Sequence, residues 1–371
     1  MKKSVHYGSA FFKIRYILFE VREKYKRIEV RRWLELSNAN QSLTSAEITQ
    51  LWTTYMNDAG LICQLEYFTA QTEDEAIKQA AMHGLELAQS HINKIEDIFN
   101  KEDYPIPYSF KLKEDVDVNA PRLFSDSYLL YYLHQGAQVA IQAHSVSLGL
   151  AGREDVYDLF SDCLQEQISF IKMVHDILQT KALYKAYPML PTPESYDFVQ
   201  NQSFLTGYFG ERRPLTGTEI NNLYGNYFRN ALGSATLIGF SQVATNNDVR
   251  KYLVRGKEIA QKHCEIFGSV LHEDDLPAST RMEDSVTDST TYTFSDKLMM
   301  YYSTGLIALS VGFYGNSMAM SPRRDLGVMY NRLLNEILKY AEDGANIMIK
   351  NGWMEEPPRA LDRDELAKKK K

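Results

Sequence analysis

The chain has 371 residues, of which 44% are hydrophobic and 24% are charged, and it is long enough for two or three globular domains. Its net charge of -7 and its pI near 5.7 exclude a dominant basic face, so we expect no nucleic-acid partner. The three cysteines are far apart and form no CxxC pair, which indicates buried thiols in a reducing, cytoplasmic compartment and no disulfide framework.

The first 40 residues are rich in lysine and arginine, with aromatic and aliphatic residues between them. Lys13 and Arg15 interrupt the apolar run that a signal peptide would need, so we expect no secretory leader. We predict that residues 1–40 form a loosely held extension, or reflect a start site placed too far upstream. A basic amphipathic surface helix is the alternative.

The rest of the chain contains an internal repeat. The stretch LTSAEITQLWTTYMNDA at residues 43–59 recurs 172 residues later as LTGTEINNLYGNYFRNA at 215–231. Further along, FSDSYLLYY at 124–132 recurs 170 residues later as FSDKLMMYY at 294–302. Matches that extend over most of both halves indicate one structural unit present twice.

Each unit opens with a helix start signal. Thr44 and Glu47, and again Thr216 and Glu219, have the T-x-x-E spacing of a capping box, with a leucine before each threonine as a hydrophobic staple. In this motif the threonine hydroxyl and the glutamate carboxylate each accept a backbone N–H of the first turn. We therefore predict that the first helix of unit one runs to about residue 68.

Three more helices follow in each unit. In unit one the second covers about 73–100 and ends before the prolines of NKEDYPIP. Ser125 and Ser295 are predicted N-caps of the third helices, and the fourth helix of unit one covers about 155–181.

The sequence therefore predicts an all-α fold of two tandem up-and-down four-helix bundles. We place the first bundle at residues 43–185 and the second at 215–358, joined by a proline-bearing linker at 186–214. Residues 359–371, which end in four lysines, are predicted to be a solvated tail.

Both third helices lack charge over a length that could cross a bilayer, at residues 127–152 and 298–320. Polar side chains such as Gln135 and Asn316 interrupt both runs, so we predict no membrane span. We expect each helix to be enclosed by its own bundle and by the neighbouring bundle. Small residues in the second run support close helix packing: Gly305, Ala308, Gly312 and Gly315.

Each unit offers one tyrosine, one histidine and one glutamate on its apolar stripes. The candidates are Tyr55, His91 and Glu166 in unit one, and Tyr227, His263 and Glu336 in unit two. Helical spacing points both histidines inward, and antiparallel packing brings each near the tyrosine of its unit. The set predicts either a buried site for a metal, proton or small ligand, or a core histidine bonded to a tyrosine. We favour the core histidine, because one His and one Glu are too few for most closed metal sites.

Bundle one has histidines that bundle two lacks. His134 and His175 are expected toward the same end as His91, where they offer a further candidate site or cap helix carbonyls. In unit two the positions of His134, His144 and His175 hold Thr304, Tyr314 and Ala345. No histidine cluster is therefore repeated.

Several stretches resemble a known family. LWTTYMNDAGLICQLEYF, NAPRLFSDSYLLYYL and KYAEDGANIMIKNGWMEEPP are similar to domain-of-unknown-function family 3231 of endospore-forming bacteria, which is related to spore coat protein F. The resemblance implies two tandem ferritin-like bundles and a spore-associated role, but no reaction and no catalytic residue. No glutamate lies three residues before any histidine, so the E-x-x-H motif of a ferritin-like di-iron centre is absent.

These observations favour a non-enzymatic structural or interaction protein that binds protein partners or itself. No GxGxxG, GxxxxGKS/T or GxSxG motif occurs, so the sequence predicts no catalytic residue and no cofactor, and whether the protein is an enzyme stays open. The alternative is a metal-binding or oxidase-like ferritin relative with a non-standard ligand set. A third hypothesis is a carrier for a small apolar ligand between helices.

Overall fold

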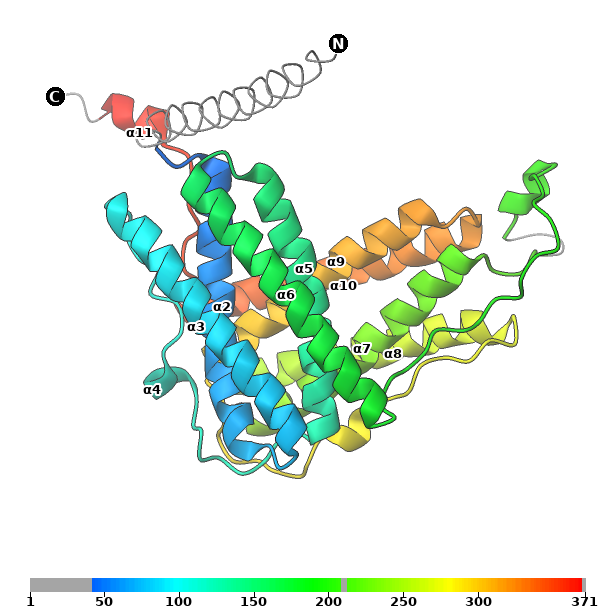
Figure 1. Ribbon diagram of the computed structural model, residues 1–371, viewed down its shortest axis with the longest axis horizontal. Helices are drawn as coiled ribbons and strands as arrows, with labels where there is room; N and C mark the ends of the chain where they lie inside the picture. Colours follow the sequence, from blue (N-terminus) through cyan, green and yellow to red (C-terminus); the bar gives the residue numbers. More distant parts are fainter. Residues whose placement is uncertain (1–41, 208–211, 369–371) are drawn as a thin grey trace, which may run out of the picture.

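The structure is a computed structural model that describes residues 42–207 and 212–368 (Figure 1). The predicted extension at residues 1–40 lies outside the described residues. Within the predicted tail, α11 (Arg363–Lys368) is a short helix whose residues are exposed.

Eight helices of 25 to 27 residues form the two units within the described ranges. The first unit comprises α2 (Ser45–Gln71), α3 (Glu75–Lys101), α5 (Asp126–Leu150) and α6 (Glu154–Thr180). The second comprises α7 (Gly217–Val243), α8 (Asn247–His272), α9 (Asp296–Met320) and α10 (Arg324–Lys350). The remaining elements are the short turns α4 (Leu112–Asp115), η1 (Gln202–Leu205) and η2 (Glu283–Ser285). The predicted all-α fold with two tandem helical bundles is confirmed, and Figure 1 shows the second bundle extending to the side of the first.

The predicted capping boxes are present and also connect helices that are far apart in the sequence. Glu47 accepts the Thr44 backbone N–H at 2.8 Å, and the Thr44 hydroxyl accepts the N–H of Glu47 at 3.3 Å. The second Glu47 oxygen accepts the backbone N–H groups of Gly152 and Arg153 at 3.0 and 2.8 Å. In the second unit, Glu219 caps α7 and accepts the N–H of Arg323 in the same way. Each glutamate therefore joins the first and fourth helices of its bundle.

The two units join through the segments that precede α5 and α9. The backbone of Ser125, the predicted cap of α5, donates to the Ser285 carbonyl at 2.8 Å, and Ser295, the cap of α9, donates to the Asp115 carbonyl at 2.9 Å. Behind these caps, the Tyr128 hydroxyl bonds with Thr236 at 2.8 Å. One hydrophobic core therefore continues from the first bundle into the second.

The two charge-free helices are surrounded on all sides at one end only. Leu129 and Leu130 in α5, and Met299 and Met300 in α9, are at most 1% exposed where the bundles meet. Farther along, an added Cβ at five glycines would meet no atom within 4 Å: Gly136, Gly149, Gly305, Gly312 and Gly315. The expectation that both runs are enclosed throughout is therefore wrong, because the bundles meet near the first turns of α5 and α9 and then diverge. The small residues in α9 do not mark close packing within the described chain.

None of the helices in the described ranges has the length and apolar character needed to cross a membrane.

Candidate metal centre

A buried polar cluster lies inside the first bundle and receives side chains from all four of its helices. Asp58 comes from α2, His91 from α3, His144 from α5, and Cys163 and Glu166 from α6. These residues lie on the core-facing sides of their helices, so their side chains point into the bundle. His91, His144 and Cys163 are 1%, 5% and 0% exposed. Polar groups buried this deeply require partners.

His91 is held between two carboxylates. Its Nδ1 lies 3.1 Å from Asp58 Oδ2, and its Nε2 lies 2.8 Å from Glu166 Oε2. Burial, the largest influence on this ring, lowers its pKa, but hydrogen bonds and charges from Asp58 and Cys163 act in the other direction and raise the pKa to about 11. At neutral pH the cluster therefore contains an imidazolium that balances nearby carboxylates.

His144 has the opposite character. Its ring centroid lies 5.7 Å from that of His91 in an edge-on arrangement, and the Phe160 ring centroid lies 6.1 Å away. Burial lowers the pKa of His144 to about 4, against the attraction of Asp58, so the ring is neutral at pH 7. Its Nδ1 is buried and has no hydrogen-bond partner among the described residues.

The cluster has the composition of a transition-metal site. One ring nitrogen of each histidine and the Cys163 Sγ all lie within 4.8 Å of one another. Neutral imidazole and thiolate are ligands that Zn²⁺ binds at about 2.0–2.3 Å, so the ligand atoms of a tetrahedral site are roughly 3.5 Å apart. Movements of these ligand atoms by at most about 1.3 Å would bring them to that spacing.

His91 does not pair with Tyr55 as predicted, and the carboxylate at its Nε2 is Glu166. The Tyr55 hydroxyl donates to Glu96 at 2.9 Å instead. The reason is register, because Asp58, one helical turn after Tyr55 on α2, is the residue level with His91 on antiparallel α3.

The other predicted histidine pair does not reach this cluster. His134 and His175 lie together, with ring centroids 6.4 Å apart, and His175 contacts Gln179. His134 precedes His144 by ten residues on α5, which places it roughly 15 Å away along the helix axis. The prediction that both lie toward the His91 end is therefore wrong.

The second bundle contains a closed hydrogen-bond network at the same level. His263 bonds with the Tyr314 hydroxyl at 2.9 Å and with Glu336 at 3.2 Å, and Asn230 donates to the same hydroxyl at 2.8 Å. His263 bonds with a tyrosine, but this tyrosine is Tyr314 and not the predicted Tyr227. Burial, opposed by Glu336, lowers the pKa of His263.

The two networks differ at three aligned positions. Asp58, His144 and Cys163 of the first bundle correspond to Asn230, Tyr314 and Leu333 of the second bundle. All three changes replace a metal-binding side chain with one that binds metals poorly or not at all. The replacement of His144 by Tyr314 is visible in the sequence, but the sequence alone does not place Asp58 and Cys163 beside His144. The informative positions are those at which the units differ.

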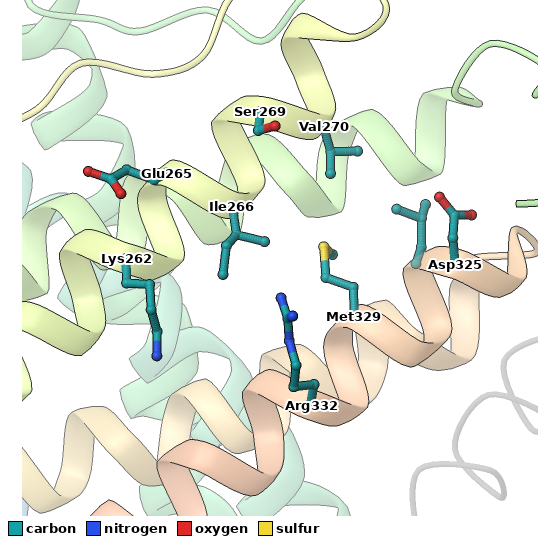
Figure 2. A pocket seen from close by; sticks show the side chains of 9 residues that line it. Lys262, Glu265, Ile266, Ser269, Val270, Asp325, Met329 and Arg332 are labelled. Carbon is teal, nitrogen blue, oxygen red and sulfur yellow. The ribbon is translucent and has the colours of Figure 1, made fainter. Parts of the chain in front are cut away.

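A groove on the outside of the second bundle is a weaker candidate. It lies between α8 and α10, and Lys262, Glu265, Ile266, Met329 and Arg332 are among its lining residues (Figure 2). The groove is open to solvent, and Lys262 forms an ion pair with Glu336 beside it. Because positive and negative side chains both line the groove, its charge does not indicate which class of ligand would bind there.

Comparisons with known proteins identify a family. No curated protein matches the chain. A solved structure described as a "putative spore coat protein" from Bacillus halodurans C-125 is 20% identical, covers 43% of this chain and 99% of its own, and has a TM-score of 0.35. The family described as "Protein of unknown function (DUF3231)" matches residues 32–195 and again 203–366. These two matches span most of the chain, so the protein belongs to the DUF3231 family and contains its unit twice.

Proposed function

We propose that this protein binds one divalent transition-metal ion inside its first helical bundle. The observation that carries the proposal is His144, a neutral and buried imidazole whose Nδ1 has no partner among the described residues, next to His91 and Cys163. An unsatisfied buried polar group costs about 1–3 kcal/mol, and coordination of a metal would remove that cost. The second bundle supports the proposal, because its corresponding network is satisfied without an ion.

The first bundle also supplies negative charge for a cation. Asp58 and Glu166 lie on either side of His91, and their side chains are 13% and 30% exposed. A bound dication would take over the neutralisation that protonated His91 provides in the metal-free cluster. Because the ligands come from four helices, the ion would connect the whole bundle.

Metal analysis of the purified full-length protein tests this proposal. After separate exposure to Zn²⁺, Fe²⁺ and Mn²⁺ and removal of free ions, we expect close to one equivalent of one of these metals per chain. The variants His144→Phe and Cys163→Ala should reduce the bound metal to a small fraction of an equivalent. His263→Phe in the second bundle is the matched control and should retain it. Substoichiometric binding of all three metals, or an equal loss in the control, would contradict the proposal.

A second candidate function is the non-enzymatic structural or interaction role that the sequence favours. Its support is the uncharged outward face of α9, where a Cβ added at Gly305 or Gly312 would meet no atom of the described chain within 4 Å. A face of this kind allows close approach of another helix, from a partner protein or from a second copy. Association that depends on protein concentration, measured by light scattering and abolished by Gly312→Glu, would support it. A protein that stays monomeric at every concentration would exclude self-association.

The spore-associated role that the family resemblance implies is part of this second candidate. Recovery of the protein in the coat fraction of sporulating cells would support it. Confinement of the protein to vegetative cells would count against it.

A further inference from the structure

We infer that the metal in the first bundle is Zn²⁺ in a closed, thiolate-ligated site that fastens the four helices together. This inference rests on the metal-binding function proposed above and names the ion, its ligands and its role. The three ligands of the core set are His91, His144 and Cys163, from α3, α5 and α6.

The ligand types favour zinc over iron or manganese. Oxidase-like di-iron bundles use several glutamates that bridge two ions, and E-x-x-H pairs supply their histidines. In the first bundle the atoms that converge are two imidazole nitrogens and one sulfur, all buried. Thiolate and imidazole together are typical of tetrahedral Zn²⁺ sites, whereas Mg²⁺ and Mn²⁺ prefer oxygen ligands.

Asp58 is the expected fourth ligand. Its hydrogen-bond partner is His91, and no lysine or arginine of the described residues pairs with Asp58, so the ion would replace the protonated ring of His91 as its partner. Glu166 is more exposed and also lies 3.9 Å from the Lys94 ammonium group. Glu166 therefore stays on the second nitrogen of His91 and orients the ring, which is the usual role of a carboxylate behind a metal-bound histidine.

The burial of these ligands indicates a structural ion. The ligand side chains are between 0% and 13% exposed, and four protein ligands fill the coordination sphere of tetrahedral zinc. A catalytic zinc would keep one position open for water or substrate. The ion instead connects α2, α3, α5 and α6 at one level of the bundle.

The role of zinc should be confined to one bundle. In the second bundle, hydrogen bonds among Asn230, His263, Tyr314 and Glu336 occupy the corresponding level. Loss of zinc should therefore loosen α2, α3, α5 and α6 and leave the second bundle unchanged.

Cobalt substitution tests the ligand set. Full-length protein loaded with Co²⁺ should show the intense visible bands of tetrahedral cobalt and a near-ultraviolet thiolate-to-cobalt charge-transfer band. Cys163→Ser should abolish the charge-transfer band, and Asp58→Asn should weaken binding at least tenfold. The matched control His263→Phe should show the unaltered spectrum. Cobalt bound without a thiolate band would overturn this inference and leave metal binding intact, whereas failure to bind any metal would overturn both.

Hydrogen exchange on the same full-length protein tests the structural role. Addition of Zn²⁺ should slow amide exchange at least tenfold in α2, α3, α5 and α6, and should not alter exchange in α7 to α10. Cys163→Ser, checked for native helix content by circular dichroism, should lose this protection. Equal protection of both bundles, or no protection despite bound zinc, would overturn the role assigned to the ion.

Discussion

At the scale of single residues, the first bundle places two histidines of opposite protonation side by side. His91 bonds two carboxylates and has a pKa raised to about 11, whereas burial without a partner lowers the pKa of His144 to about 4. At neutral pH one ring carries a positive charge and the other has a free lone pair. The difference follows from their neighbours, because both residues lie on apolar stripes of their helices.

The pKa of His144 predicts acid sensitivity of the metal-free protein. Its folded pKa lies below the unfolded value near 6.5, so the unfolded state binds the proton first, and stability falls as the pH drops from 6.5 to 4. The loss should be on the order of 3 kcal/mol, at about 1.4 kcal/mol for each pKa unit. In urea titrations with chelator present, His144→Phe should show a shallower pH dependence over this range. Identical slopes in both proteins would contradict the assigned pKa.

The sequence did not predict which residues of neighbouring helices lie opposite each other. The apolar stripe correctly placed His91 in the core, but the stripe did not specify which residue of α2 lies opposite it. A shift of three residues replaces a neutral Tyr55 hydroxyl with the Asp58 carboxylate. That shift changes the interpretation of the cluster from a structural hydrogen bond to a candidate metal site.

At the scale of elements, the helix starts were predictable because capping depends on residues within one turn. The second contact of each capping glutamate was not, because Glu47 reaches Gly152 and Arg153 more than 100 residues away. The sequence was similarly limited for the charge-free runs. A lack of charge showed that α5 and α9 are unusual helices, but it did not show what covers each part of them.

Glu47 should matter more to stability than an ordinary helix cap. Glu47→Ala removes the capping box and leaves the N–H groups at the start of α6 without their acceptor, so we expect a loss of about 2–4 kcal/mol in the free energy of unfolding. Glu47→Gln keeps an acceptor oxygen and should lose less than half as much. Urea denaturation of the two variants measures both effects. A loss below about 1 kcal/mol for Glu47→Ala would mean that the link to α6 adds nothing.

Two glycines in the second bundle should respond oppositely to alanine. Tyr252 and Tyr340 stack at 4.2 Å between α8 and α10, and a Cβ at Gly256 would overlap the Tyr340 hydroxyl. Gly256→Ala should therefore destabilise the protein by about 1–3 kcal/mol. Gly312→Ala, on the open face of α9, should stabilise it by about 0.5–1 kcal/mol through helix propensity. Thermal unfolding compares them, and a loss of stability in Gly312→Ala would show that this face is packed.

At the scale of the whole molecule, the duplication was clear in the sequence, but the sequence predicted only part of the structure that results from it. Two bundles and their linker follow from local patterns that occur twice. The junction does not, because the segment before α5 pairs with the segment before α9 through backbone hydrogen bonds, which leave no residue pattern in the sequence. Divergence of the copies was visible at Asp58, His144 and Cys163, but it gained meaning only when the fold placed these residues together.

The copies therefore have different expected roles within one continuous core. The second bundle completes its polar network with protein groups, and the first leaves His144 Nδ1 without a partner among the described residues. An ion bound in the first bundle would therefore change the stability of one half of the molecule without disturbing the other.

X-ray absorption at the zinc edge of the loaded full-length protein is the measurement that tests this account most directly. The first bundle should hold about one equivalent of zinc, with a single sulfur neighbour near 2.3 Å and nitrogen or oxygen neighbours near 2.0–2.1 Å. Absence of the sulfur shell, or its persistence in Cys163→Ser, would contradict it.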